Sequence, residues 1–173
     1  MSTNLRSPGR TALVILAAAA ACSAPSRAQY LPDATWFEGP GHWRVAFSPV
    51  TQHWRPSDEH RHVWALGAER WGDNHRVWGA SYFTNSFGQP SAYAYLGTRY
   101  PGILGQPALY AQWTAGLMYG YKGAYKNKVP LNYGGFSPGA VLSLGFEATP
   151  QTSFQYNLLG DAAVMFQISH RWR

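Results

Sequence analysis

The feature that most restricts the fold of this chain is a series of segments of roughly ten residues in which apolar and polar side chains alternate. The clearest segment is Leu109–Tyr121. Neighbouring residues of a β-strand point to opposite faces, so one face of this segment carries leucine, tryptophan and tyrosine, and the other carries glutamine, threonine and glycine. Phe136–Phe146 and the last segment of the chain repeat the pattern. Alternation over this length is typical of tilted strands that cross a membrane.

Turn residues separate these segments from others with weaker alternation. The expected strands are Trp43–Val50, His62–Arg70, Arg76–Phe83, Ala92–Arg99, Leu109–Tyr121, Phe136–Phe146, Ser153–Leu158 and a final strand that ends near Trp172. We therefore predict an all-β fold, an eight-stranded antiparallel transmembrane β-barrel of the outer membrane. A soluble barrel of the lipocalin kind also alternates, but with its apolar side chains inside, and it is the alternative.

Two observations favour the membrane barrel over the soluble one. Few charged residues lie within the expected strands, and aromatic residues gather at strand ends, as interfacial girdles require. The aromatic residues in question are Trp43, Trp71, Tyr100, Tyr121, Phe136 and Trp172. The composition agrees, because a chain that is 46% hydrophobic and only 13% charged is unlike a disordered or coiled-coil protein.

The N-terminus has the pattern of a cleavable secretory signal peptide over residues 1–28. Arg6 and Arg10 precede an apolar stretch, and small residues end at Ala28. Residues 29–42 then form a short periplasmic lead segment and 43–173 the barrel. The sole cysteine, Cys22, leaves with the signal, unless it is instead the acylated cysteine of a lipoprotein. Export through this signal, followed by insertion of the barrel, predicts an outer-membrane location.

The lengths of the connections indicate how the barrel is oriented. With both chain ends in the periplasm, the first, third, fifth and seventh connections lie outside the cell. Residues 51–61, 84–91 and 122–135 make three of these outer connections, and they are longer than most of the inner ones. This arrangement agrees with the preference of outer-membrane barrels for long outer loops.

Polar residues on the first two outer connections are candidates for chemistry. His53 lies on the first connection, and Asn85 and Ser86 lie on the second, so neighbouring hairpins bring them to one rim. There His53 can take a proton from an attacking hydroxyl, and Ser86 can act as nucleophile or oxyanion donor. The competing interpretation is that these are ordinary polar loop residues. His60 and His62 allow a metal site in principle, but no third ligand is evident, so we expect neither a metal nor a cofactor.

Lysines and glycines supply the remaining candidates. The only lysines, Lys122, Lys126 and Lys128, all lie on the third outer connection, where they can attract the phosphates of lipopolysaccharide or simply keep a long loop soluble. Several glycines fall on the polar face, which is the expected lumen: Gly67, Gly79, Gly97, Gly116, Gly120, Gly139 and Gly145. They either leave a hollow for one acyl chain or relieve strain in a tightly coiled small barrel.

Several of these positions together resemble the PagP-type lipid A palmitoyltransferases, which are small outer-membrane barrels. Thr51-Gln52-His53 matches a histidine that the family carries after its first strand, and Asn85-Ser86-Phe87 matches an Asp-Ser pair after its third, with Asn85 in place of the aspartate. Gly97 falls where the family has a glycine that sets acyl-chain length. Residues 128–131 and 137–145 resemble the proline-rich stretch around the family's sixth strand, whose prolines leave a gap for lipid.

The resemblance implies an acyltransferase that moves an acyl chain from a phospholipid to lipid A at the outer rim. Catalytic roles then fall to His53, Asn85 and Ser86, and substrate-binding roles to Gly97, Lys122, Lys126 and Lys128. The sequence also resembles small proteobacterial outer-membrane proteins labelled glycerol-3-phosphate transporters, so the alternative is a barrel without catalysis that binds lipid, supports the envelope or passes a small solute. Membrane lipids are the expected partners of a monomer, and nucleic acid is not expected.

Overall fold

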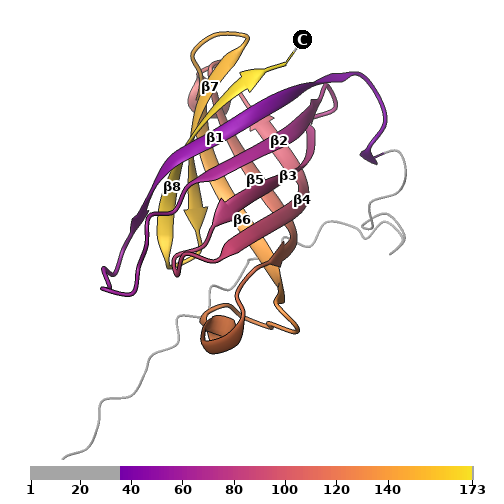
Figure 1. The fold of residues 1–173 in the computed structure, drawn as a ribbon. Helices are drawn as coiled ribbons and strands as arrows, with labels where there is room; N and C mark the ends of the chain where they lie inside the picture. Colours follow the sequence, from indigo (N-terminus) through magenta and orange to yellow (C-terminus); the bar gives the residue numbers. More distant parts are fainter. Residues whose placement is uncertain (1–35, 173) are drawn as a thin grey trace, which may run out of the picture. The chain divides into compact units, whose positions relative to one another are not determined.

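The computed structural model describes residues 36–172, and most of them belong to β-strands. The strands are β1 (Gly41–His53), β2 (Ala65–Gly72), β3 (Arg76–Thr84), β4 (Pro90–Pro101), β5 (Leu109–Tyr119), β6 (Phe136–Glu147), β7 (Thr152–Leu159) and β8 (Ala163–Arg171). Each strand pairs antiparallel with its neighbour in sequence, and β1 also pairs with β8, which closes the barrel (Figure 1). Two short 3-10 helices, η3 (Ile103–Gly105) and η4 (Gly123–Lys128), lie in connections. The same residues include no helix long and apolar enough to cross a membrane.

The proposed signal peptide, 1–28, and most of the proposed lead segment, 29–42, lie outside the described residues. The end of the lead segment does not, because β1 already begins at Gly41. Strand bounds otherwise shift by a few residues from those expected. The largest differences are that β1 runs on to His53 and that β2 starts at Ala65 instead of His62. His62–Trp64 instead belong to the loop, in which the Arg61 amide donates to the Ser86 carbonyl at 2.8 Å.

The wall of the barrel is apolar outside and polar inside. On β6 and β7, Leu142 and Tyr156 are 62% and 58% exposed, whereas Ser143 and Gln155 on the opposite faces are buried. The inward-facing polar side chains bond to one another, as in the 2.7 Å hydrogen bond that Ser143 donates to Asn157. This pattern is the reverse of a soluble barrel and matches a strand wall that faces hydrocarbon. The predicted fold class is confirmed, and the lipocalin-like alternative is excluded.

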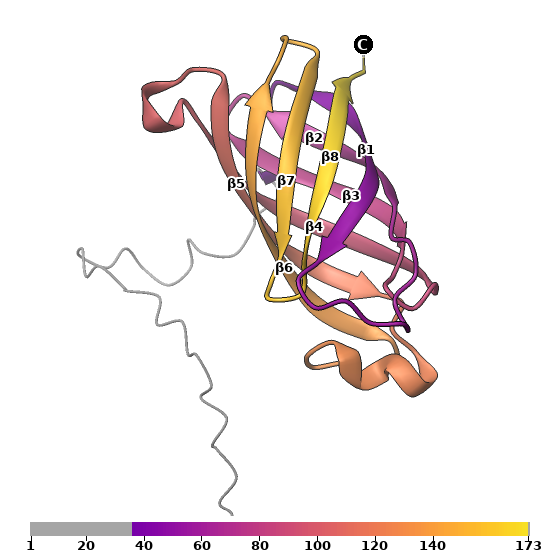
Figure 2. The same ribbon diagram turned by 90° about the vertical axis from the view of Figure 1, so that its left-hand side faces the viewer.

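The two ends of the barrel differ in their connections, as the two views show (Figures 1 and 2). We call the end at which β1 begins and β8 finishes the terminal end; it also carries the β2–β3, β4–β5 and β6–β7 connections. The opposite end, here the loop end, carries the β1–β2, β3–β4, β5–β6 and β7–β8 connections, including η4. Long connections therefore gather mainly at the loop end.

Backbone pairing weakens toward the loop end in two places. β6 pairs with β7 only over Leu142–Glu147, so the first six residues of β6 extend past the end of β7. Pro138 lies in this part of β6, which pairs with β5 but not with β7, and proline has no N–H to donate. On β1, the register with β8 shifts between Phe47 and Val50, around Pro49. Proline at a sheet edge or at a bulge does not remove a hydrogen bond between strands.

The terminal half of the lumen is filled by side chains. Trp71 and Tyr110 are 2% and 1% exposed and pack edge to face, with ring centroids 5.4 Å apart. The guanidinium groups of Arg44 and Arg99 lie over the Trp71 ring, 4.2 and 4.1 Å from its centroid. Glu69 accepts a hydrogen bond from Tyr95, and Arg99 forms an ion pair with Glu147. We call this cluster (Arg44, Glu69, Trp71, Arg99, Tyr110) the lumen plug.

The plug corrects two expectations drawn from the sequence. Trp71 is not part of an aromatic girdle, because it shares the inward face of β2 with Ala65, Gly67 and Glu69. Charged residues do occur within the strands. Arg44, Glu69 and Arg99 face the lumen, whereas Arg70 faces outward near the end of β2. A glycine makes room for the plug: a Cβ at Gly145 would overlap the Tyr110 ring. Gly139 likewise lies against the Tyr93 ring. At other lumen glycines a Cβ would instead overlap the backbone of the neighbouring strand, as at Gly67, Gly79, Gly97 and Gly116.

Candidate active site at the loop end

The structure brings His53 and Ser86 together at the loop end. His53 is the last residue of β1, and Ser86 follows β3 in the short β3–β4 loop. The Nε2 atom of His53 lies 2.7 Å from the Ser86 hydroxyl oxygen, a hydrogen bond whose direction depends on the histidine tautomer. Both side chains are half-buried. A hydroxyl held this close to an imidazole has the geometry of a nucleophile beside its general base.

Asn85 fixes the loop that carries Ser86. Its side chain is 1% exposed, and its carbonyl oxygen accepts hydrogen bonds from the backbone N–H groups of Phe87 and Gln89, both at 3.0 Å. Its amide donates to the Gln89 side chain at 3.2 Å. Asparagine commonly stabilises turns through such local bonds. Asn85 therefore stabilises the turn that carries Ser86. Both polar atoms of its side chain are already hydrogen-bonded within that turn.

An aromatic cluster surrounds the His53–Ser86 pair, and the sequence patterns did not single it out. The ring of His60, from the β1–β2 loop, lies 4.3 Å from that of His53. Phe87 stacks on Tyr125 of η4 at 4.2 Å and also meets His60 edge to face at 5.9 Å. Phe87 thus connects its own β3–β4 loop with the β1–β2 and β5–β6 loops. Its position directly after Ser86 was the only signal, and a single aromatic in a turn is too common to be informative.

Tyr121 is a further member of the site. We expected it on the lipid face because it continues the alternation of Leu109–Tyr119, but it lines the lumen instead. β5 ends at Tyr119, and Gly120 follows with φ of 151°, a backbone conformation that breaks the alternation. Tyr121 interacts with Ser86 through its side chain, and burial raises the pKa of Tyr121, with the Ser86 contact opposing the rise. Its hydroxyl is therefore a protonated donor at neutral pH.

A cavity of about 620 Å³ opens beside these residues and occupies the loop half of the lumen. Its size lies within the range of small-molecule sites, roughly 300–1,000 Å³. Apolar side chains line its upper part: Val63, Ala65, Phe83, Met118 and Met165. Amides line its deeper part: Gln112, Gln155, Asn157 and Gln167. The cavity does not include the lumen plug apart from Glu69, so the hollow ends part of the way through the barrel.

The cavity also reaches the wall of the barrel. Pro138–Val141 on β6 and Leu159–Ala162 at the β7–β8 connection all line it, on the two sides of the place where β6 and β7 do not pair. One of these residues is Ala140, which is exposed on the outer face of β6. The unpaired part of β6 therefore borders a lateral opening as well as the cavity. We call this region the β6–β7 seam.

The other candidate residues lie in different surroundings. Gly97 faces inward on β4 but is buried between Val77 and Thr114 of the neighbouring strands, and it does not line the cavity. Lys128 lines the mouth of the cavity, where it pairs with Glu59 at 3.3 Å. Lys122 lies over the Tyr119 ring, 4.3 Å from its centroid, and Lys126 is exposed on η4. Of the three lysines, Lys128 alone lines the cavity.

Carboxylates do not complete a catalytic triad in the part of the chain that the structure describes. Glu59 faces Lys128, and Asp58 is exposed; neither forms a hydrogen bond with His53. Residues 36–172 likewise contain no group of three or more histidine, cysteine or acidic side chains arranged to hold a metal ion. The polar side chains that the structure brings into contact at this site are the imidazole of His53 and the hydroxyls of Ser86 and Tyr121.

Comparison with known proteins supports the fold class. No protein family and no curated protein matches the sequence. Among solved structures, a de novo designed transmembrane β-barrel superposes with a TM-score of 0.54 at 16% identity, over 78% of this chain and 98% of that one. The outer-membrane protein Ail of Yersinia pestis aligns at 14% identity and a TM-score of 0.41, over 77% of this chain and 100% of that one. The closed barrel, with its apolar outer face and polar lumen, places the chain among the transmembrane β-barrels.

Proposed function

We propose that this protein is an outer-membrane acyltransferase of the PagP type. It would transfer an acyl chain from a phospholipid to lipid A at the loop end, which would face the outside of the cell. The observation that carries the proposal is the 2.7 Å contact between His53 Nε2 and the Ser86 hydroxyl at the mouth of a cavity of about 620 Å³. The cavity supplies a place for one acyl chain beside a candidate nucleophile and its base.

The reaction we propose has two steps. The Ser86 oxygen attacks the ester carbonyl of the phospholipid while His53 takes the hydroxyl proton, and the lysophospholipid alkoxide then leaves with that proton. The acyl chain is now esterified to Ser86. A hydroxyl of lipid A gives its proton to His53, attacks the acyl-serine and releases Ser86, which recovers the proton. Tyr121 would donate a hydrogen bond to the oxyanion in both steps, and no cofactor is required.

Two further features support a lipid substrate. The β6–β7 seam would let a phospholipid acyl chain reach the cavity directly from the membrane, without passing through water. Lys128 at the mouth, with Lys122 and Lys126 in the same loop, would attract the phosphates of lipid A. In this scheme Asn85, which also lines the cavity, holds the Ser86 turn through its hydrogen bonds to Phe87 and Gln89.

Mass spectrometry of lipid A tests the proposal. Cells that express the protein should gain a lipid A species heavier by one acyl chain, and cells carrying Ser86→Ala or His53→Ala should not. Ser57→Ala and His62→Ala are matched controls, because both residues are exposed in the loop after β1. These controls should retain the modification. Unmodified lipid A in cells that contain folded, unmutated protein would refute the proposal.

The second candidate is a barrel that binds lipid in the same cavity without turnover. The specific observation in its favour is that no carboxylate among residues 36–172 is hydrogen-bonded to His53, so the imidazole lacks the partner that usually orients a general base. It predicts that phospholipid copurifies with the protein while lipid A stays unchanged. Passage of a small solute such as glycerol phosphate is disfavoured, because the lumen plug fills the terminal half of the barrel.

A further inference from the structure

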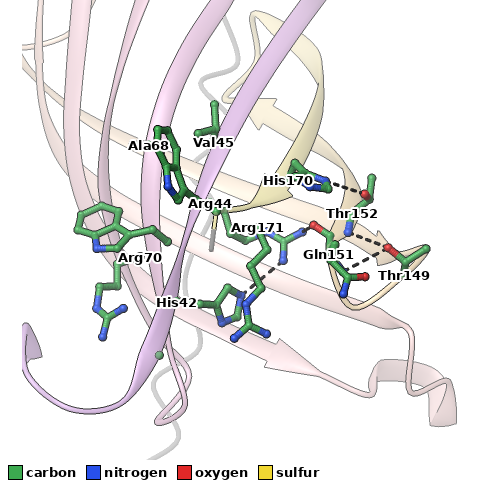
Figure 3. A pocket seen from close by; sticks show the side chains of 13 residues that line it. His42, Arg44, Val45, Ala68, Arg70, Thr149, Gln151, Thr152, His170 and Arg171 are labelled. Atoms are coloured by element: carbon green, nitrogen blue, oxygen red, sulfur yellow. Dashed lines mark hydrogen bonds between the residues drawn. The ribbon is translucent and has the colours of Figure 1, made fainter.

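A second concave surface lies at the terminal end, on the side of the barrel where β1 meets β2 and β8. It is a groove of about 1080 Å³, bordered by the start of β1, the end of β8 and the β6–β7 turn (Figure 3). Five basic side chains line it: His42, Arg44, Arg70, His170 and Arg171. No acidic residue is among the residues that line it. We call this surface the basic groove.

The positive charge of the basic groove is not balanced by carboxylates within it. Arg44 donates its hydrogen bonds to neutral oxygens, namely the Ser169 and Ser153 hydroxyls and the Gln151 carbonyl, at 3.0–3.1 Å. Arg70 donates to the Gly39 carbonyl at 3.0 Å. Between residues 36 and 172, neither these two arginines nor Arg171 forms an ion pair. Glu69 and Glu147 act on Arg44 from the lumen and do not line the groove.

The groove opens onto the outer wall as well as the rim. Strand pairing sets Val45 beside Ala68 on one side and beside His170 on the other, and His170 beside Thr152, all on the outward face. Trp43 and Trp172, which also line the groove, are 41% and 68% exposed. Exposed tryptophans at the edge of an apolar wall mark the level of the lipid head groups. The basic groove therefore spans the rim. Arg70 and His170 lie on its outward side, at the level of the head groups, and the other three basic residues lie on its inward side.

We propose that the basic groove binds the phosphate of an anionic glycerophospholipid from the leaflet around the terminal end. Arg70 would hold the phosphate from the outward face of β2, and Arg171, which pairs with Arg44 on the inward face, would reach it over the rim at the start of β1. The acyl chains would lie along Val45, Phe47 and Leu66, which share the outward face. The choice of a lipid over a free anion follows from the outward-facing apolar residues Val45 and Ala68, which line the groove beside Arg70. This site is at the opposite end from the His53–Ser86 site and does not depend on the proposed acyl transfer.

Native mass spectrometry of the exported protein in an uncharged detergent tests this inference. The probes are phosphatidylglycerol, diacylglycerol with the same acyl chains and inorganic phosphate. Each basic residue at a membrane surface contributes about fivefold in affinity, so Arg70→Gln with Arg171→Gln should weaken phosphatidylglycerol binding by more than about tenfold. Each single variant should show an intermediate loss. Arg61→Gln removes the same charge at the loop end and should leave the affinity unchanged.

The outcomes separate a lipid site from other occupants. Phosphatidylglycerol binding that depends on Arg70 and Arg171, with weak binding of diacylglycerol and little competition by inorganic phosphate, supports the proposal. Equal binding of phosphatidylglycerol and diacylglycerol would overturn it, since the arginines would then play no part. Full displacement of the lipid by inorganic phosphate would also overturn it and leave a free-anion site. Because Arg70 and Arg171 are at least partly exposed, all variants should fold.

Discussion

At the scale of single residues, two aromatic side chains turn inward against the sequence expectation. Trp71 and Tyr121 both looked like girdle aromatics at strand ends, yet Trp71 fills the lumen and Tyr121 lines the cavity. A residue at a strand end faces lipid only if it lies an even number of residues from another lipid-facing residue of the strand. The strand must also keep its regular alternation up to that residue. Gly120 breaks the alternation before Tyr121, and such a break is invisible in a polarity pattern.

Tyr121→Phe tests whether this hydroxyl takes part in the proposed acyl transfer. The variant keeps the ring and removes only the donor, and loss of one oxyanion donor lowers turnover by about a hundredfold. We expect a fall of that order in palmitate transfer by detergent-purified protein, with the thermal unfolding midpoint unchanged. Tyr125→Phe is the control. This variant also removes one hydroxyl and keeps the ring that stacks on Phe87, and it should retain full activity. Equal turnover in the two variants would remove Tyr121 from the mechanism.

At the scale of elements, the strands were predictable and the loops were not. Alternation located all eight strands, because each strand has a lipid-facing and a lumen-facing side with opposite preferences. The chain order of the loops also predicted that His53 and Ser86 would share a rim. The aromatic contacts of Phe87 with His60 and Tyr125 join three separate loops, and no periodicity records a contact of that kind. The β6–β7 seam was indicated only through Pro138 and its neighbours.

Phe87→Ala tests the coupling between the loops. An aromatic pair contributes about 0.5–1.5 kcal/mol, so losing the stack on Tyr125 and the edge contact with His60 should raise local opening by about tenfold. Hydrogen exchange should accelerate in the β1–β2 loop and in η4, and stay unchanged in the strands. Phe37→Ala, which removes an edge contact with Trp78 at the other end, is the control. Unaltered exchange in both loops would show that they are held by other contacts.

At the scale of the whole molecule, the barrel is divided into a hollow half and a filled half. The loop half holds the cavity, and the terminal half holds the lumen plug. The sequence indicated small residues in the lumen but not where empty space remains. The space beside a glycine can be taken by a tyrosine ring from the neighbouring strand, as the Tyr110 ring takes the space beside Gly145. This division predicts a barrel that holds a ligand and conducts no ions.

Trp71→Ala combined with Tyr110→Ala tests the plug. Planar bilayers with the unmutated protein should show no steady conductance, and the double variant should show small open events. Each buried aromatic removed costs about 3–5 kcal/mol, so the free energy of unfolding in urea should also fall. Trp113→Ala is the control, because it changes a side chain on the outer face of β5. Bilayers with this variant should show no conductance. Steady conductance by the unmutated protein would contradict the division of the lumen.

The shortness of β7 has a consequence for the surrounding lipid. β7 has 8 residues, as β2 does, whereas the neighbour of β7, β6, has 12. A tilted strand needs about 9–11 residues to cross the hydrocarbon core. The bilayer would therefore thin where it meets the β7–β8 hairpin, and lipids there would pack less tightly than those beside the longer β6. The barrel would in this way create, in its own annulus, a patch from which a lipid is withdrawn at a lower energetic cost.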